Sequence, residues 1–261
     1  MTEKLIRTDK DYIAYLKLND NPANSLSSEM MGAIQAELTE IDTNPAIRVV
    51  VFESASEKIF CSGHSLTEVK GMMSDKDVQA QEKLFAQCSM MMKQIQQISK
   101  PAIAKVRGVA TAAGNQLVAS CDLAYGSEDS RYALPGANIG LFCHTPQVAV
   151  SRTVGRKATM EMLLSGQMIN SAKAEKIGLI NKVVSSADLD SEVEMICATI
   201  NQKSAEVIAQ GKRSFYRQIE MGLTDAYAAT SQNMVKNLEL NDANEGISSF
   251  LEKRQPEWTN D

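Results

Sequence analysis

The amino-acid sequence predicts an α/β fold with a helical C-terminal part. Short apolar runs typical of strands alternate with longer segments whose apolar residues recur every three or four positions, as on one face of a helix. Beyond about Arg156 the strand-like runs nearly stop and the helical spacing takes over. No linker rich in Pro, Gly or Ser, no repeat and no low-complexity segment divides the 261 residues. We therefore expect one continuous domain, with a core over residues 1–195 and a helical extension over residues 196–261.

The first elements follow from composition and turn residues. Tyr12–Leu18 has the composition of a strand, and Asn19–Pro22 then turns the chain. Ser27 or Ser28 can cap the helix that follows. The apolar positions of this helix are four, four and three residues apart: Met30, Ile34, Leu38 and Ile41.

A second strand and a second long helix come next. Val49–Phe52 is predicted to be a short buried strand, and Asp77–Ile98 a long helix. One apolar stripe runs along this helix: Leu84, Cys88, Met91, Ile95 and Ile98. We expect the run Met90–Met92 to fill the core, because thioether side chains pack into irregular gaps. Two further strands are predicted at Ala102–Val106 and Cys121–Ala124.

The second half of the chain is predicted to be helical. Four apolar stripes indicate four helices: Met160/Leu163/Leu164 ending at Gly166, Leu189/Val193/Ile196/Ile200, Phe215/Ile219, and Phe250/Leu251. A helical tail of this kind is typical of an element that mediates oligomerisation.

Composition and charge exclude several classes of protein. A hydrophobic content of 44% with 23% charged residues is that of a globular chain and excludes disorder and collagen-like repeats. The 27 Lys and Arg against 32 Asp and Glu give a formal net charge of −5. An acidic chain without a basic run argues against nucleic acid as a partner.

Cysteines and apolar segments bear on location. The five cysteines are widely scattered and form no C-x-x-C pair, which indicates reduced thiols and neither a disulfide framework nor a zinc site. Met1–Arg7 interleaves charged and apolar residues and forms no signal-peptide core. The charge-free stretch Tyr132–Ser151 contains prolines, glycines and amides, so we expect a buried or site-lining loop and no membrane span. These observations predict a cytoplasmic protein without a membrane partner.

Three loops carry small residues where a chain normally places larger ones: Phe60–Leu66, Gly108–Gln116 and Leu134–Pro146. Glycine and alanine allow the backbone to approach a ligand closely, and amides at the start of a helix are unsatisfied donors. Two such amides from separate loops could form an oxyanion hole. Tight packing where a strand meets a helix is the alternative, and spacing alone leaves both open.

Four segments carry a resemblance to a known family. They are Phe60–Leu66, Gly108–Leu117 running on to Ser120–Leu123, Ile169–Val184 and Glu245–Arg254. In this order they resemble the loops A-F-x-A-G-x-D-[IL] and G-x-A-x-G-G-G-x-x-L…CD, the stretch I-x-A-x-E-A-x-x-x-G-L-[IV]-x-x-V-V and the terminus E-G-x-x-A-F-x-E-K-R. The chain therefore resembles the enoyl-CoA hydratase/isomerase (crotonase) superfamily over nearly its whole length.

The resemblance implies a β-β-α spiral core, a C-terminal helical region that forms homotrimers or homohexamers, and an acyl-CoA thioester as ligand. It implies no metal, and no cofactor beyond the CoA of the substrate. The thioester oxygen would meet the backbone N–H groups of His64 and Ala113, the two oxyanion donors. Further substrate contacts are implied for Cys61, Gly63, Ser65, Leu66, Thr67 and Gly136, and for Phe250 and Lys253 of the neighbouring subunit.

The sequence departs from the resemblance at both catalytic glutamates of the hydratases. Gln116 stands at the first glutamate position and Gly136 at the second, after Pro135. A glutamine amide can hold water or substrate but does not titrate near neutral pH, and glycine offers only backbone. Each positioned acid or base typically contributes about 10²–10⁴-fold to a rate. We therefore expect enolate chemistry other than standard hydration, such as the isomerase or lyase reactions of fatty acid metabolism.

His144 is the candidate acid/base, because isomerase-type members place a glutamate after a similar Leu-Gly-Leu run and imidazole titrates near neutral pH. A hydrogen-bonded loop histidine is the alternative. Cys61 and Cys143 are expected to be small buried apolar residues. A non-catalytic acyl-CoA binding or regulatory protein remains the second interpretation. A Rossmann enzyme is excluded, because no G-x-G-x-x-G follows the first strand.

Overall fold

Two β-sheets form the centre of the molecule, whose structure is a computed structural model that describes residues 3–260. The larger sheet has the strand order β1-β2-β3-β5-β7-β10, and the smaller the order β4-β6-β8-β9. The strands of the larger sheet are β1 (Leu5–Lys10), β2 (Ile13–Leu18), β3 (Val49–Ser54), β5 (Ala102–Val106), β7 (Leu123–Ser127) and β10 (Lys182–Val184). Those of the smaller are β4 (Ile59–Cys61), β6 (Val109–Thr111), β8 (Arg131–Ala133) and β9 (Ile169–Asn170).

The chain winds through both sheets as a spiral. Each turn adds one strand to the larger sheet and one to the smaller, and then a helix: β3, β4 and α2–α3, then β5, β6 and α4, then β7, β8 and α5–α6. The neighbouring strands β3, β5 and β7 are parallel, as are β4, β6 and β8. The predicted α/β class and β-β-α spiral core are confirmed.

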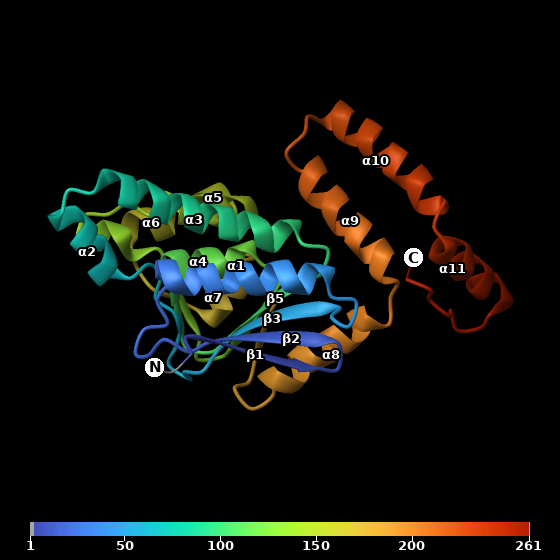
Figure 1. Ribbon diagram of the computed structural model, residues 1–261, viewed down its shortest axis with the longest axis horizontal. Coiled ribbons are helices and arrows are strands. Elements are labelled where there is room, and N and C mark those ends of the chain that lie inside the picture. The colour runs from blue at the N-terminus through green and yellow to red at the C-terminus, as the bar shows by residue number, and fades with distance from the viewer. Residues whose placement is uncertain (1–2, 261) are drawn as a thin grey trace.

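Helices cover the sheets and form the end of the chain (Figure 1). Those of the core are α1 (Ser28–Thr43), α2 (Leu66–Ser74), α3 (Val78–Gln97), α4 (Ala113–Ser120), the 3₁₀ turn η1 (Pro135–Ile139), α5 (Pro146–Thr153), α6 (Arg156–Ser165), α7 (Ser171–Lys176) and α8 (Leu189–Asn201). The last three are α9 (Ala205–Gln218), α10 (Leu223–Leu238) and α11 (Asn241–Glu252). Ser27 and Asp77 cap α1 and α3, since their side chains accept from Met30 N and Ala80 N.

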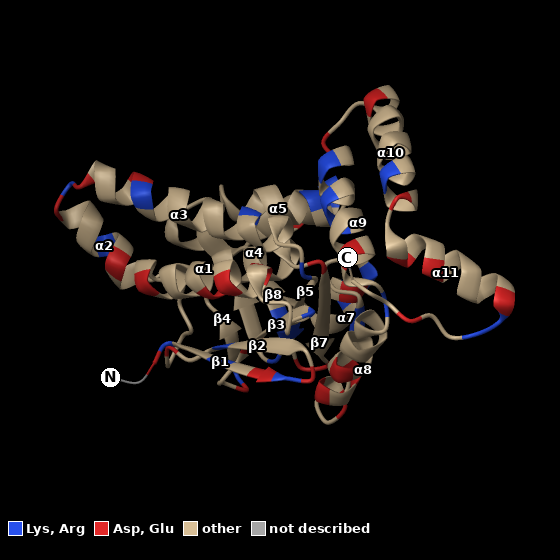
Figure 2. Ribbon diagram, turned by 45° about the vertical axis from the view of Figure 1, so that its right-hand side comes forward, with Lys and Arg blue, Asp and Glu red and all other residues tan. Residues whose placement is uncertain are grey.

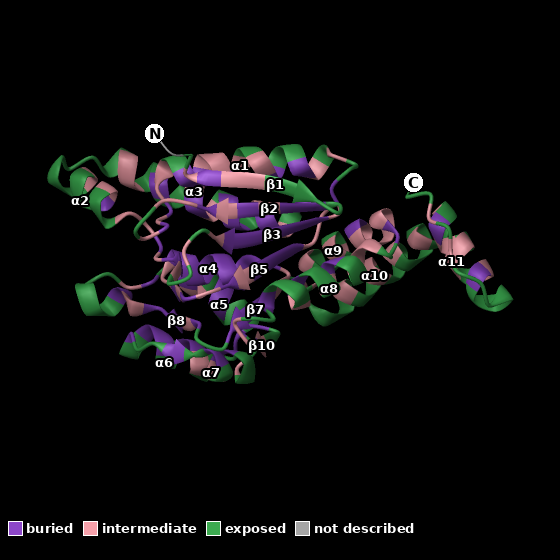
Figure 3. Ribbon diagram, turned by 90° about the horizontal axis from the view of Figure 1, so that it is seen from below, coloured by how far each residue is buried: buried purple, intermediate pink, exposed green. Residues whose placement is uncertain are grey.

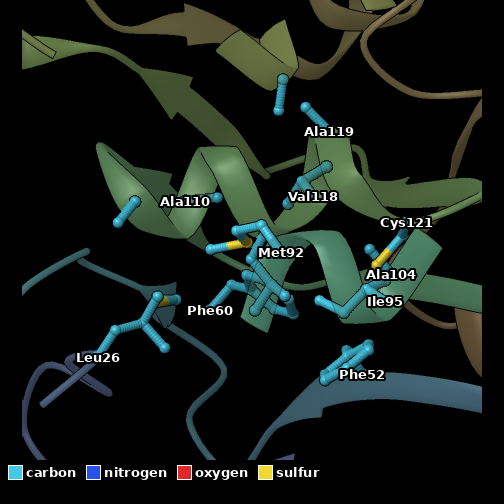
Figure 4. Close-up of a cluster of buried hydrophobic side chains, with 14 of the residues drawn as sticks. Leu26, Phe52, Phe60, Met92, Ile95, Ala104, Ala110, Val118, Ala119 and Cys121 are labelled. Atoms are coloured by element: carbon cyan, nitrogen blue, oxygen red, sulfur yellow. The ribbon is translucent and has the colours of Figure 1, made fainter. Parts of the chain in front are cut away.

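The core lies between the larger sheet and helices α1, α3 and α4. The predicted stripes of α1 and α3 are buried there, together with Phe52, Phe60 and Leu117 (Figure 4). Met91 and Met92 fill the core as expected, whereas Met90 is 56% exposed because it lies on the opposite face of α3. Figure 3 shows the consequence: β2, β3, β5, β7 and α4 are mostly buried, β1 is largely intermediate or exposed, and the outer helices α1 and α3 are buried on one side only.

Helices α9, α10 and α11 form an arm that projects from one end of the core (Figure 1). Helix α10 has no buried residue, and α9 has only Ala209. The predicted boundary between residues 195 and 196 falls inside α8, whose Leu189, Val193 and Cys197 pack against the sheet. The arm itself begins after Gln202, where α8 ends.

Several local expectations differ from the structure. Strand β1, which the sequence analysis did not predict, pairs antiparallel with β2. It is an edge strand with one exposed face, so it can carry charged residues that a buried strand would not. In α6 the buried residues include Met162 and Leu163, whereas Met160 and Leu164 are exposed in the single chain. The prediction that Met160 and Leu164 belong to the buried apolar stripe is therefore wrong for the single chain. Tyr132–Ser151 forms β8, η1 and most of α5. Among residues 3–260 no helix combines the length and apolar character needed to cross a bilayer.

Candidate functional site

The first predicted loop follows β4 and is held against the segment before α1. Leu26 N donates to Gly63 O at 2.8 Å, and Nδ1 of His64 lies 3.3 Å from Leu26 O. Gly63 has a φ of +94°, which only glycine adopts without strain. The Ser65 side chain then caps α2 by accepting from Glu68 N, while Leu66 and Thr67 are exposed. The turn and the cap therefore place His64 between the end of β4 and the start of α2.

The second loop places the start of α4 beside Gly63. Ala112 has φ +51° and donates its N–H to Ala133 O at 3.0 Å, which fixes the turn before the helix. A Cβ atom on Gly63 would lie 2.9 Å from Ala113 N. A Cβ on Gly114 would lie 2.1 Å from Cys61 O, so α4 can approach β4 only with glycine there. The two loops are therefore in direct backbone contact.

The contact leaves two amide donors on adjoining turns. Within residues 3–260, neither His64 N nor Ala113 N donates a hydrogen bond. Ala113 is the first residue of α4, where intrahelical partners for the N–H are lacking by geometry. The structure thus brings together the two backbone donors that the sequence predicted.

Gln116 lies one turn further along α4 and is 4% exposed. Its Oε1 lies 3.9 Å from Cys88 Sγ, and Ser120 Oγ donates to its backbone oxygen. Gln116 lines a cavity of about 630 Å³ between α3, α4, α5 and α9. The opposite wall of this cavity is formed by Tyr216 and Ile219 of α9.

Gly136 lies in η1 and has no room for a side chain. A Cβ atom there would lie 2.0 Å from Leu141 O and 2.9 Å from Cys143 Sγ, and Leu141 N donates to Gly136 O at 2.9 Å. The third loop therefore folds back over the position at which hydratases carry a glutamate.

His144, the predicted acid/base, lies in the exposed loop before α5. Its ring centroid is 5.2 Å from that of Phe142, and the backbone N–H of His144 donates to Phe142 O at 2.8 Å. Thr145 beside it lines the cavity with Gln116, whereas His144 is not among the lining residues in the described part of the chain. The structure leaves His144 near the cavity without a contact to Gln116.

The His64 side chain is more enclosed than a backbone donor requires. Its ring packs edge-on against Phe85 with centroids 5.3 Å apart, and Nε2 is buried without a partner among the described residues. Burial lowers the pKa of His64, against a smaller opposing effect of the Leu26 carbonyl. The imidazole is consequently neutral at physiological pH.

The thiols in these loops are buried and unreactive. Burial raises the pKa of Cys61 to about 12 and also raises the pKa of Cys143. A thiol that stays protonated is a poor nucleophile. The expectation that both are small apolar residues agrees with this burial.

Phe250 and Lys253 lie away from the amides in their own chain. Both belong to the end of α11, at the far side of the molecule from α2 (Figure 1). Phe250 is 81% exposed and Lys253 adopts φ +58° as the C-cap. One chain therefore does not bring these two residues to the site.

A partly buried polar cluster beside the cavity was not expected from the sequence. Asp122 accepts from Lys212 Nζ at 2.7 Å, from Tyr216 OH at 2.8 Å and from Ala102 N at 2.6 Å. Lys212 also donates to Ile95 O and Lys100 O, and burial lowers its pKa. The cluster joins α9 to the core, and its members lie about ninety residues apart, so no local signal identifies it.

Asn115 is a second feature that the sequence did not single out. It is fully buried in α4, and neither atom of its side-chain amide has a partner within residues 3–260. The signal available was a large amide within a segment of glycines and alanines. Within the same residues no group of three or more His, Cys, Asp or Glu side chains is arranged to hold a metal ion.

Comparison with known proteins identifies relatives along the whole chain. The family model described as enoyl-CoA hydratase/isomerase matches residues 8–261. Enoyl-CoA hydratase domain-containing protein 3, mitochondrial, of Xenopus laevis is 44% identical over 241 residues, 92% of this chain and 81% of the relative. The resemblance carried by the four sequence segments is confirmed by this match.

Two solved structures share the fold. An enoyl-CoA hydratase of Mycobacterium smegmatis has a TM-score of 0.94 at 42% identity, covering 98% of this chain and 99% of that one. Human enoyl-CoA hydratase domain-containing protein 3 has a TM-score of 0.94 at 39% identity, covering 98% and 100%.

The comparison overturns the predicted cytoplasmic location. The Xenopus relative and its rat and human counterparts are all mitochondrial by name. The prediction rests on reduced thiols, which argue against an oxidising compartment but do not distinguish one reducing compartment from another.

Proposed function

The chain belongs to the enoyl-CoA hydratase/isomerase family, and on this premise we propose that it binds an acyl-CoA thioester and catalyses enolate chemistry other than standard hydration. The thioester oxygen lies between the amides of His64 and Ala113. The CoA follows the loop of Ser65, Leu66 and Thr67, next to Cys61 and Gly63. The reaction is that of an isomerase or lyase of fatty acid metabolism.

The pair of unpartnered amides carries this proposal. Both donors sit on turns fixed by backbone contacts, so they need no rearrangement when negative charge develops on the thioester oxygen. Donors held in this way stabilise an oxyanion by about 10²–10³ in rate for each donor. When a base removes a proton from the carbon next to the thioester, the charge moves onto this oxygen. Reprotonation at another carbon then moves the double bond.

The cavity behind Gln116 supports a place for the acyl chain. The cavity begins one helical turn from the Ala113 amide. Its volume of about 630 Å³ is large enough for a short acyl chain. Gln116 can hold a substrate oxygen or water by its amide but cannot remove a proton. Gly136 contributes no side chain at all. Standard hydration, which needs a base for the water and an acid for the carbon, is therefore disfavoured.

The amide of Ala113 can be tested by removing its proton. Ala113→Pro deletes the N–H at the first position of α4, where no intrahelical bond is lost. Because Gly63 packs against this nitrogen, the melting temperature of the variant is measured alongside binding. We expect the variant to bind butyryl-CoA at least ten-fold more weakly and free CoA, which has no thioester oxygen, unchanged. Ala113→Ser keeps the N–H and is the matched control. Equal weakening for butyryl-CoA and CoA would reject the oxyanion assignment.

The second interpretation is a non-catalytic acyl-CoA binding or regulatory protein. The exposed position of His144 favours it, because no other titratable side chain replaces the glutamates in these loops. Turnover of a panel of enoyl-CoA thioesters decides between the two. Turnover that falls at least ten-fold in His144→Ala supports the enzyme with His144 as acid/base. Binding without turnover of any member supports the regulatory protein, and crotonyl-CoA hydration at an ordinary hydratase rate contradicts the predicted effect of Gln116 and Gly136.

We further propose that the arm assembles a homotrimer or homohexamer and brings Phe250 and Lys253 to the CoA of a neighbouring subunit. Figure 2 shows that α10 is uncharged along most of its length. The apolar side chains that α9–α11 leave exposed support this assembly: Phe215, Ile219, Leu223, Met234, Val235, Leu238, Ile247 and Phe250. Light scattering should give three or six times the mass of 28.5 kDa. A monomer at micromolar concentration would contradict it.

A further inference from the structure

A second cavity, of about 670 Å³, lies between the core and the base of the arm. Its walls come from the β1–β2 turn, the segments before β3 and β5, the junction of α8 and α9, and the end of the chain. The last residues return to the base of α9, where Ala205 N donates to Asn260 Oδ1 at 2.9 Å (Figure 1).

This cavity is separate from the candidate acyl-CoA site. Arg48 and Lys100 line it just before β3 and β5, at the amino ends of two parallel strands. The loops with His64 and Ala113 follow β4 and β6, which come after the carboxyl ends of β3 and β5. The amides of His64 and Ala113 therefore lie at the other end of these strands from Arg48 and Lys100. Within residues 3–260 no residue lines both cavities, although Lys212 joins their walls by donating to Lys100 O and to Asp122.

The two cations in the cavity have no counterion. Within residues 3–260, neither Arg48 nor Lys100 lies within 4 Å of a carboxylate oxygen. Arg48 donates to the Lys203 carbonyl, and the Lys100 ammonium has no hydrogen bond among the same residues. Burial lowers the pKa of both groups. The charges of Asp42 and Glu206 oppose this effect at Lys100, where Arg48 adds to it, and the charge of Asp242 opposes it at Arg48. Two partly buried like charges that face each other are unfavourable unless an anion joins them.

The carboxylates nearby are already engaged. Glu206 pairs with Arg213 at 3.0 Å, and Asp11 lies 3.8 Å from Lys10. Asp42 accepts from Ser99 N and Oγ at 2.6 and 2.7 Å. Asp242 accepts from Thr259 N and Asn260 N at 2.7 and 3.1 Å. The acidic side chains around the cavity thus have other partners, whereas neither cation has a carboxylate within 4 Å among residues 3–260.

Asn201 adds an acceptor to the same wall. Its Nδ2 donates to Asp11 O at 3.1 Å, which fixes the amide, while its Oδ1 is buried without a partner in the described chain. A buried acceptor without a donor costs about 1–3 kcal/mol. Because this oxygen is enclosed, a ligand that supplies a hydroxyl or amino group satisfies it only when the Asn201 side chain turns toward the cavity.

We propose that this cavity binds a small organic anion, a phosphate monoester or carboxylate that also carries a hydroxyl or amino donor. The guanidinium of Arg48 and the ammonium of Lys100 hold the anionic group, because the fork of an arginine matches phosphate and carboxylate oxygens. The hydroxyl or amino group donates to Asn201 Oδ1. Since the walls come from both core and arm, the ligand also fixes the base of the arm against the core.

Glycerol 3-phosphate, which carries both groups, and inorganic phosphate, which lacks the carbon-bound hydroxyl donors, are the probes. Their binding to the full chain is measured by calorimetry, together with the melting temperature. We expect glycerol 3-phosphate to bind more tightly than phosphate and to raise the melting temperature. Lys100→Gln and Arg48→Gln should each weaken glycerol 3-phosphate binding at least ten-fold. Lys100→Arg keeps the charge and should retain most of the affinity.

Lys83→Gln is the matched control, since it removes an exposed lysine of α3 without touching the cavity. Asn201→Ala should abolish the preference for glycerol 3-phosphate over phosphate. No binding of either probe at millimolar concentration, or an equal loss in Lys83→Gln, overturns the proposal. A change in oligomeric mass in Lys100→Gln with unchanged anion binding also overturns it, and assigns the cations to a carboxylate of a second copy.

Discussion

The three candidate loops contain two kinds of position. The amides of His64 and Ala113 act through the backbone, whereas what Gln116 and Gly136 contribute depends on the side chain. The amides are placed by backbone contacts, chiefly the approach of α4 to β4 at Gly114 and the turn at Gly63. The resemblance matches Gln116 and Gly136 to the two hydratase glutamates, and neither supplies an acid. The backbone donors are in place while the side-chain acids are absent.

The difference between backbone donors and side-chain acids shows which substitutions the fold tolerates. A donor made of backbone depends on close packing, so a change at either glycine disturbs the fold as well as the site. A side-chain acid can be lost without a packing cost, because glutamine is isosteric with glutamate. Gly136 differs from Gln116 in its surroundings as well, because Leu141 O occupies the space that a side chain would need.

The largest effect is expected where the backbone contact is tightest. Gly114→Ala places a Cβ 2.1 Å from Cys61 O, so α4 must move away from β4. We expect a loss of about 3 kcal/mol or more in the free energy of unfolding, because overpacking a buried contact is costly. Urea unfolding measures it.

Gly71→Ala is the matched control for this prediction. Gly71 lies inside α2, and a Cβ added there would meet no atom within 4 Å, so alanine should stabilise the helix by about 0.5–1 kcal/mol. If Gly114→Ala unfolds at the same urea concentration as wild type, the backbone contact does not hold the two amides.

The second prediction tries to restore the side chains. Gln116→Glu combined with Gly136→Glu returns both hydratase acids, yet we expect no gain in crotonyl-CoA hydration, because η1 must open to admit the second glutamate. The substitution at Gly136 should cost about 2–3 kcal/mol of stability. Gly71→Glu introduces the same charge on an exposed helix and is the control. Hydration at an ordinary hydratase rate in the double variant would show that side-chain loss alone separates this chain from hydratases.

The smallest effect concerns the side chain on one of the backbone donors. Burial lowers the pKa of His64 below its ordinary value of 6.5, so the unfolded chain takes up this proton at higher pH than the folded chain. Stability is therefore lost as the pH falls below 6.5 towards the folded pKa, and is unaffected well above it. His64→Gln should flatten the decrease in melting temperature over this range. His144→Gln, with an exposed ring, is the control, and an unchanged slope in His64→Gln contradicts the burial of the imidazole.

Much of the fold was predictable because its signals are local. The stripes of α1 and α3, the cap at Ser27 and the strands β2, β3 and β5 appear where their patterns predict them, whereas the strand predicted at Cys121–Ala124 overlaps β7 only at Leu123 and Ala124. The edge strand β1 and the exposed Met160 show the limit. An edge strand needs only one apolar face, and a helical stripe does not say which of its residues meets the core.

The sequence by itself determined the family and the order of the three loops, because motifs are written in consecutive residues. It also placed Gln116 and Gly136 at the positions that the resemblance matches to the hydratase glutamates. Tertiary structure alone decided that Gly136 has no space for a side chain, that Asp122 joins Lys212 and Tyr216, and that Arg48 and Lys100 face one cavity without a counterion. The physical reason is sequence separation. These contacts join residues brought together only when the spiral closes, and no pattern of neighbours along the chain specifies them.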